Sequence, residues 1–435
     1  MEYMTDISDI MEHEDTGNGS YVVIPEYVTE IEDGAFAKDK SLKKIDLNNV
    51  RRIGAHAFQE CTDLESVIMS NVTEIGPGAF EFCRSLRSIT FENITSVGDE
   101  AFMNCSMLDI PEMPCSLTQV GAGAFSHTAI RSVDLHWLDE IPASLLSYCT
   151  SLTDADIVGA KVIGNDAFAG CRALSEVRLG ELEKIGKGAF QKCDAFELVR
   201  LPDTLRYIGD DAFSVIRGGL IIPGSVSCIG KDCLGPVDRK KEIRIYRSSL
   251  YEFRNYFRDD RADPFDEDEH FYLWESSIDV TVLDEQTGET IGFLPLYSDL
   301  ERQLRKELTE AFRPDNTFDY SFLDEVLFSG LKWNQRCKDR HAVMRLSHPF
   351  ELTRSAREEY IAYLEKHLKR IVRRAVHNRD VDMLIFLCDV GLIGKENITD
   401  VIDHSISMSA SECTAFLLER QSELGCSSDP LLDEL

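Results

Sequence analysis

The chain has 435 residues, 43% of them hydrophobic, which is enough for two or more domains and a sizeable buried core. The 77 Asp and Glu outnumber the 46 Lys and Arg and give a formal net charge of −31. This charge disfavours a general nucleic-acid binder and electrostatic docking to anionic membranes. No stretch approaches the roughly 18 apolar residues of a membrane span, so we expect no membrane insertion.

The first 34 residues contain ten Asp or Glu and no Lys or Arg, and residues 1–20 indicate an acidic tail. A secretory signal needs a basic start and an apolar run, and neither is present. The thirteen cysteines are odd in number, which favours reduced thiols. We therefore expect a cytoplasmic protein, and an extracellular one only if an upstream export signal has been removed.

One phrase recurs about every 22 residues between residues 21 and 250. "IGAHAFQECTDLESVI" begins at Ile53, and "IGPGAFEFCRSLRSIT" begins at Ile75. Leu-Leu at 145–146 and Cys-Leu at 233–234 replace its Ala-Phe pair. A phrase repeated at fixed spacing predicts a stacked structural unit. The pair itself stands at Ala35-Phe36, Ala57-Phe58, Ala79-Phe80, Ala101-Phe102, Ala124-Phe125, Ala167-Phe168, Ala189-Phe190 and Ala212-Phe213.

Each repeat also contains two apolar residues spaced two apart, such as Ile45 and Leu47, which leave the same face of a strand. Eleven such pairs run from Val22/Ile24 to Ile243/Ile245. Each repeat therefore predicts one short strand, a turn and a short helical or irregular segment. Stacking them at about 4.8 Å predicts an α/β repeat solenoid whose parallel sheet has about eleven strands and is on the order of 50 Å long.

The repeated small and aromatic residues are expected in the solenoid core. Phe58 and Phe80 should be buried, and Gly54 and Gly76 suit turns where a side chain would crowd. Six cysteines share one repeat position and predict an internal column: Cys61, Cys83, Cys105, Cys149, Cys171 and Cys193. A disulfide between neighbouring sulfurs is an alternative. A zinc site is disfavoured, because zinc binds four ligands arranged around one point and these cysteines are expected in a line. We expect no metal and no cofactor.

The phrase "IGAHAFQECTDLESVIM" resembles a BspA-type leucine-rich repeat, a family named for bacterial surface proteins. The resemblance covers about residues 21–250. It implies a curved solenoid that binds proteins or other macromolecules through its sheet face. Many members of the family are exported and displayed on cells, and this sequence departs from them in having no export signal at its start.

Outward-facing strand positions form a candidate partner-binding face. With Ile45 and Leu47 inward, Asp46 points outward. The middle of the face is acidic and its C-terminal third is basic, a pattern that orients a partner of opposite charge; a solvated face of random charge is the alternative. Trp137 ends one strand, either as an exposed binding residue or as a plug where Thr128 replaces the cysteine. The candidate residues are Asp46, Glu112, Asp134, Asp154, Asp156, Glu176, Arg178, Arg200 and Arg244.

Residues 251–276 indicate an acidic linker or cap. The stretch "RDDRADPFDEDEHF", residues 258–271, suggests a calcium loop, but the EF-hand spacing is absent. Residues 277–350 predict a β-hairpin followed by helices. In the hairpin, Val280 and Val282 precede a Thr-Gly turn, and Ile291 and Phe293 follow it.

Two segments, residues 299–312 and residues 352–376, have apolar residues three and four apart, which predicts helices. The second helix carries a basic patch, for which we expect a solvated face. The patch consists of Lys366, Lys369, Arg370, Arg373 and Arg374.

Residues 351–435 contain a second, shorter self-similarity. Residues 375–392 align without gaps to residues 405–420, a step of 30 residues. The pattern resembles the paired helices of an ankyrin repeat, although the "TPLH" turn signature is missing. The resemblance implies helical hairpins that stack on the preceding helices and offer a binding surface.

Catalytic motifs are absent: there is no phosphate-binding GxxxxGK[ST], no HExxH, no GxSxG and no CxxC. Cys337 with His341 is a weak pair for Cys–His catalysis, since no orienting acid or oxyanion donor accompanies it. We assign no catalytic residue and predict a non-enzymatic scaffold that binds another protein. A secreted or displayed adhesin and an enzyme within residues 277–370 are the alternatives. The sequence names neither the partner nor the oligomeric state.

Overall fold

The computed structural model describes residues 20–90, 92–214, 216, 218–234, 243–253, 277–284, 286–297, 310–328 and 335–425. They belong to two units, the first comprising Met1–Ser298 and Arg305–Phe318, the second Asp299–Leu304 and Asp319–Leu435. The calcium-loop stretch and nearly all of the predicted acidic tail, of the predicted linker and of the helix over residues 299–312 lie outside the described residues.

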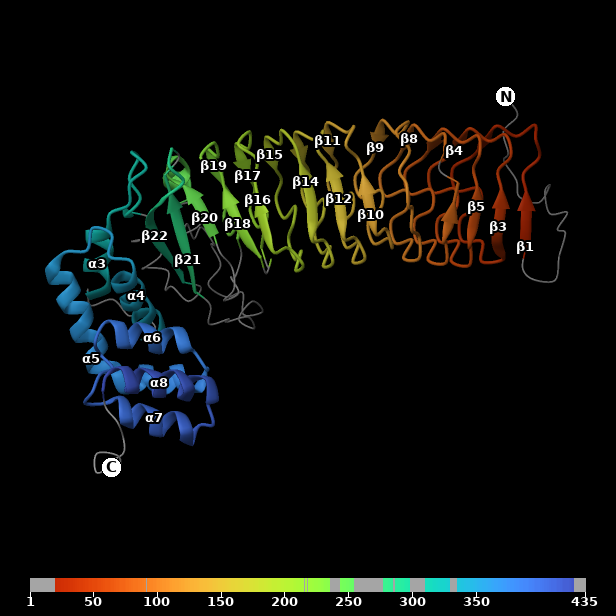
Figure 1. Ribbon diagram of the computed structural model, residues 1–435. Helices are drawn as coiled ribbons and strands as arrows, with labels where there is room; N and C mark the ends of the chain where they lie inside the picture. The colour runs from red at the N-terminus through yellow and green to blue at the C-terminus, as the bar shows by residue number, and fades with distance from the viewer. Residues whose placement is uncertain are drawn as a thin grey trace, which may run out of the picture. The chain divides into compact units, whose positions relative to one another are not determined.

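The first unit is a solenoid of parallel strands, which confirms the predicted fold class (Figure 1). Strand pairing joins β1-β3-β5-β7, β10-β12-β14 and β16-β18-β20, so in the described residues this sheet is interrupted twice. The strands are β1 (Ser20–Val23), β3 (Leu42–Asp46), β5 (Ser66–Ile68), β7 (Ser88–Ile89), β10 (Ser132–Asp134), β12 (Asp154–Ile157), β14 (Glu176–Leu179), β16 (Leu198–Arg200), β18 (Gly219–Ile222) and β20 (Ile243–Tyr246).

The first interruption corrects the prediction for Glu112. This residue was expected on the outward face of a strand, but it lies in a bend outside any strand. Its neighbours Pro111 and Pro114 explain the difference, because proline has no N–H to donate to a strand ladder.

A second strand in each repeat was not predicted from the sequence. These strands are only two residues long, and most contribute one buried Ile or Val. They pair in the orders β2-β4-β6-β8-β9 and β11-β13-β15-β17-β19. Their bounds are β2 (Glu30–Ile31), β4 (Arg52–Ile53), β6 (Glu74–Ile75), β8 (Ser96–Val97), β9 (Gln119–Val120), β11 (Glu140–Ile141), β13 (Val162–Ile163), β15 (Lys184–Ile185), β17 (Tyr207–Ile208) and β19 (Cys228–Ile229).

The Gly-x-x-Ala-Phe segment is irregular rather than helical. In one repeat, His56 and Glu60 have positive φ angles of 54° and 59°. The backbone N–H of Phe58 donates to the carbonyl of Ala79 in the next repeat at 2.7 Å. These backbone hydrogen bonds recur along the solenoid. The turns therefore link neighbouring repeats in addition to the two series of paired strands.

The solenoid core follows the predicted pattern. The rings of Phe58 and Phe80 are stacked with centroids 5.0 Å apart and planes 2° apart, and both side chains are fully buried. The cysteines of the column are free thiols, which excludes the disulfide alternative for them. Each Sγ donates to the carbonyl of the Ala-Phe position in the preceding repeat, as Cys83 does to Phe58 at 3.0 Å.

The predicted hairpin is present, and its two strands extend the last solenoid sheet. Strand β21 (Ser277–Leu283) pairs in parallel with β20, and β22 (Thr290–Tyr297) pairs antiparallel with β21. Between β20 and the hairpin come the short helices η2 (Arg247–Ser249) and α1 (Leu250–Phe253).

The second unit is helical in its described part. Its helices are α3 (Tyr320–Phe328), α4 (Gln335–Ser347), α5 (Arg354–His377), α6 (Val381–Asp389), α7 (Ile398–Ser407) and α8 (Ser411–Glu423).

The predicted helical self-similarity extends to the backbone. Arg379 and Ser409, 30 residues apart, have positive φ angles of 54° and 52°. The N–H of Asp380 donates to Ala375 at 2.8 Å, and that of Ala410 donates to Ser405 at 3.0 Å. The two helical hairpins, α5–α6 and α7–α8, therefore share one turn geometry.

Candidate partner-binding face

The strand face is formed by the outward residues of β10, β12 and β14. The register aligns Ser132 with Asp154 and Glu176 in one row. It aligns Asp134 with Asp156 and Arg178 in the other. Between the rows, Val133 and Ala155 point inward and are buried. We define the strand face as Ser132, Asp134, Asp154, Asp156, Glu176 and Arg178.

Two basic side chains contact the carboxylates of the second row. Arg178 Nη2 lies 2.8 Å from Asp156 Oδ2, and His136 Nδ1 lies 2.7 Å from Asp134 Oδ1. The His136 hydrogen bond lowers the pKa of Asp134, and the Arg178 charge acts in the same direction. Asp154 and Glu176 are exposed, and neither forms an ion pair with any residue in the described ranges. The strand face therefore presents carboxylates together with one arginine.

The remaining candidate residues lie elsewhere on the solenoid. Asp46, on β3, is half-buried and accepts a hydrogen bond from the N–H of Asn48 at 2.9 Å, so it holds a turn. Glu112 lies in the bend described above. Arg200 and Arg244 are on β16 and β20, where they flank Ile221 in the register.

A pocket of about 240 Å³ lies at the C-terminal ends of β14, β16, β18 and β20, and the sequence analysis missed it. One partial signal was available: in two consecutive repeats a proline follows the strand, at Pro202 after β16 and at Pro223 after β18. The pocket is lined by Leu179, Arg200, Leu201, Pro202, Asp203, Ile221, Pro223 and Tyr246.

Trp137 is half-buried, and its Nε1–H donates to the carbonyl of Leu117 at 2.8 Å. This contact supports the plug interpretation rather than a fully exposed binding residue. Thr128 occupies the vacant place in the cysteine column, donating to the carbonyl of Phe125 at 2.8 Å, with Cys149 Sγ 3.2 Å away.

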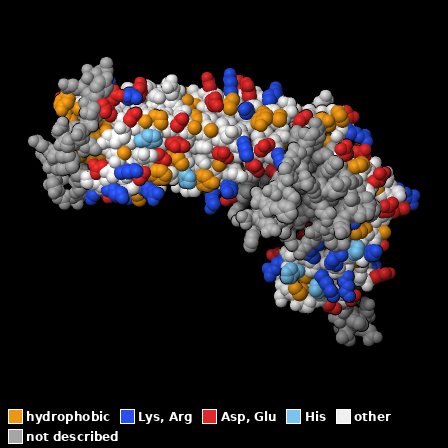
Figure 2. All heavy atoms as spheres, turned by 180° about the vertical axis from the view of Figure 1, so that it is seen from behind, with side chains coloured by type: hydrophobic (Ala, Val, Ile, Leu, Met, Phe, Trp, Pro, Cys, Tyr) orange, Lys and Arg blue, Asp and Glu red, His pale blue; other side chains and the backbone are white. Residues whose placement is uncertain are grey.

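Figure 2 shows the opposite side of the solenoid from Figure 1, with acidic, basic and apolar side chains interspersed.

The helical unit carries the predicted basic patch, but two of its five residues form ion pairs with a carboxylate of the same unit. Arg370 Nη2 lies 2.7 Å from the buried carboxylate of Asp339, and Arg374 Nη1 lies 3.2 Å from it. Lys366, Lys369 and Arg373 remain exposed.

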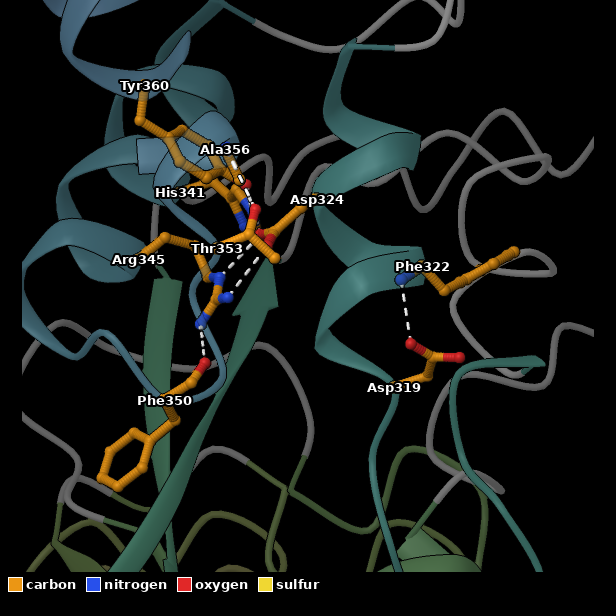
Figure 3. A network of polar contacts seen from close by, with 9 residues as sticks. All are labelled: Asp319, Phe322, Asp324, His341, Arg345, Phe350, Thr353, Ala356 and Tyr360. Carbon is orange, nitrogen blue, oxygen red and sulfur yellow. Dashed lines mark hydrogen bonds and ion pairs between the residues drawn. The ribbon is translucent and has the colours of Figure 1, made fainter. Parts of the chain in front are cut away.

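The weak Cys–His hypothesis is not supported by the position of His341. This ring is fully buried, and its Nε2 lies 3.1 Å from Tyr360 Oη within a polar network (Figure 3). Burial and the Arg345 charge lower the pKa of His341 to about 3, so the ring is neutral near pH 7. The side chain of Cys337 lies outside the described residues.

Within the described ranges, no group of three or more His, Cys, Asp and Glu side chains is arranged to hold a metal ion. No helix in these ranges is long and apolar enough to cross a membrane.

The repeat geometry agrees with a comparison with known families. A profile described as a BspA type leucine-rich repeat region, in six copies, matches residues 13–131, 92–194 and 139–259, which together exceed half of the chain. The chain belongs to the BspA type leucine-rich repeat family. Proteins of this family typically take part in protein interaction or surface adhesion.

Solved structures similar to this BspA-type chain are bacterial leucine-rich repeat proteins. The T. pallidum leucine-rich repeat protein TpLRR is 32% identical, with 41% of this chain and 78% of that chain covered and a TM-score of 0.31. The pneumococcal vaccine antigen PcpA is 20% identical, with 56% and 71% covered and a TM-score of 0.38. A leucine-rich repeat protein from Bacteroides ovatus is 20% identical, with 54% and 89% covered and a TM-score of 0.28. A comparison with curated proteins gave no match.

Proposed function

We propose that the chain is a non-catalytic binding protein that holds a partner protein on the strand face. The observation that carries the proposal is the register of three adjacent strands, in which inward apolar residues alternate with outward residues. Five of the six outward residues are charged, and of these five only Asp156 is half-buried rather than exposed. Stacked parallel strands fix these side chains on a rigid support. Electrostatic complementarity on such a surface sets the orientation and the identity of a partner.

The experiment is a pull-down from the source cell's lysate with the full chain as bait. The lysate is the first source because we propose a reducing compartment, consistent with a column of free thiols. Wild type is compared with a triple variant, Asp134→Lys, Asp156→Lys and Arg178→Glu. The matched control is Glu74→Lys, Glu140→Lys and Lys184→Glu, which makes the same charge changes at exposed positions of the other strand series.

We expect a protein captured by wild type and by the control, and lost by the strand-face variant. Circular dichroism of all three must agree, because the proposal concerns the surface and not the core. A protein held equally by all three baits would exclude the strand face as the binding site. A lysate in which no protein passes this comparison would also contradict the proposal.

A further inference from the structure

The pocket beside the strand face has an apolar interior and a charged rim. Leu201 and Ile221 are 2% and 4% exposed, and with Leu179 they form apolar wall from three successive strands or strand ends. Pro202 and Pro223 complete this lining. The volume of about 240 Å³ is smaller than the roughly 300–1,000 Å³ of most small-molecule sites, and is of the order that one side chain fills.

Arg200 lies on the rim of this pocket and is exposed. It forms no ion pair within the ranges that the structure describes, whereas Arg178, one repeat earlier, is already bonded to Asp156. A guanidinium has five N–H donors in a planar fork that matches a carboxylate. Arg200 therefore places one cation, with no ion-pair partner in the described ranges, beside the apolar lining.

We propose that this pocket anchors a partner peptide in which an apolar side chain is followed directly by a carboxylate residue. The apolar side chain enters the cavity against Ile221 and Leu201, and the carboxylate pairs with Arg200. The inference rests on the proposed function, because it identifies the segment of the partner that binds next to the strand face.

Asp203 adds selectivity to this arrangement. Its exposed carboxylate also lines the pocket, so it repels a second acid placed on its side of the cavity. A cation and an anion on one rim favour a single acid at a defined position over a run of acids. The preferred ligand is therefore an apolar–acidic pair rather than a generally acidic peptide.

The test uses saturation-transfer difference NMR with the full chain and three acetylated, amidated hexapeptides. Their sequences are Gly-Gly-Leu-Glu-Gly-Gly and its analogues with Gln or Lys in place of Glu. We expect the Leu methyl groups to be saturated, with the Gln peptide binding about five- to tenfold more weakly than the Glu peptide and the Lys peptide more weakly still. A fourth peptide, with Ala in place of Leu, should show no saturation of any of its protons.

The variant Arg200→Glu should reverse the order, so that the Lys peptide binds best. Arg200 is exposed, and this substitution leaves the apolar lining intact. Arg172→Glu makes the same charge change at an exposed site outside the pocket and should bind like wild type. Equal binding of the Glu, Gln and Lys peptides, absence of any Leu saturation, or an unchanged order in Arg200→Glu would overturn the proposal.

The peptide test and the pull-down together distinguish a failure of the pocket inference from a failure of the proposed function. If the pull-down shows a partner lost by the strand-face variant but the peptides do not bind, the pocket inference is wrong and the proposed function stands. If neither a partner nor a peptide is bound, both are wrong.

Discussion

Arg345 and Asp324 form a buried, two-pronged ion pair that links α4 to α3. The Nε and Nη2 atoms of Arg345 donate to Asp324 Oδ1 and Oδ2 at 2.7 and 2.9 Å. The two residues are 0% and 6% exposed. Tyr360 of α5 donates to Asp324 Oδ1 at 2.7 Å, so one carboxylate joins three helices (Figure 3).

Substituting Asp324→Ala should destabilise the helical unit by about 3–5 kcal/mol, because it leaves the Arg345 guanidinium buried without a counter-charge. Urea unfolding of the full chain, followed by far-ultraviolet circular dichroism, measures the change. The control is Glu358→Ala, which removes the exposed partner of Arg354 and should cost about 0.5 kcal/mol or less. Similar losses in the two variants would show that the buried pair contributes no more than a surface one.

The helical unit should lose stability as the pH falls from about 6.5 toward 3, because His341 stays neutral in the folded state. Its pKa is lowered to about 3 by burial and by Arg345, so over this range the unfolded chain takes up a proton that the folded chain does not. The loss is on the order of 3 kcal/mol between pH 6.5 and 4, and the contribution of His341 to the pH dependence fades above about pH 7.5.

The measurement compares urea midpoints of wild type and His341→Gln at several pH values in this window. Asp324, Arg345 and Tyr360 face the ring region and are kept in both proteins, so the difference between the two pH profiles isolates His341. His136→Gln removes an exposed imidazole and serves as the control. Parallel profiles for wild type and His341→Gln would contradict the prediction.

The sequence predicted those elements whose pattern is local. Ile45 and Leu47 predicted inward strand positions because alternation is visible within three residues. The strand Glu30–Ile31 was missed because one buried residue produces no alternation. The pairing of Arg345 with Asp324 could not be predicted, since the partners lie 21 residues apart on different helices. The pocket is lined by residues of four repeats, so a single repeat does not reveal it.

Gly76→Ala should destabilise the solenoid by about 1–3 kcal/mol, since an added Cβ would lie 2.8 Å from the backbone N of Ala55 and the carbonyl C of Gly54. Backbone atoms of the preceding repeat cannot rotate away as a side chain can. Thermal unfolding measures the effect. Gly394→Ala is the control, because nothing lies within 4 Å of its added Cβ, and its change should stay near zero or be slightly stabilising. A neutral Gly76→Ala would show that the repeats are not held at this spacing.

Cys115 should be alkylated by iodoacetamide well before the cysteine column reacts. Cys115 is exposed, whereas Cys149 and Cys171 are fully buried. Burial raises the pKa of the Cys149 thiol to about 11 and also raises that of Cys171, so little reactive thiolate forms near neutral pH. Peptide mass spectrometry after timed labelling should find the column modified only in urea. Labelling of Cys149 as fast as Cys115 in native buffer would contradict the buried column.

Capture of the partner by the strand face should weaken as salt is added, because all but one of the charges that we propose for binding are exposed. Raising the salt concentration from roughly 0.1 M to 1 M shortens the Debye length from about 10 Å to about 3 Å, which screens the attraction of exposed charges for the partner. The comparison is with a variant that keeps the shape of the strand face but not its charge, namely Asp134→Asn, Asp156→Asn and Arg178→Gln. Its weaker capture should depend less on salt than that of wild type. If both baits lose the partner with the same salt dependence, the charges on β10, β12 and β14 do not contribute to binding, and apolar contacts, such as those of the neighbouring pocket, would have to account for it.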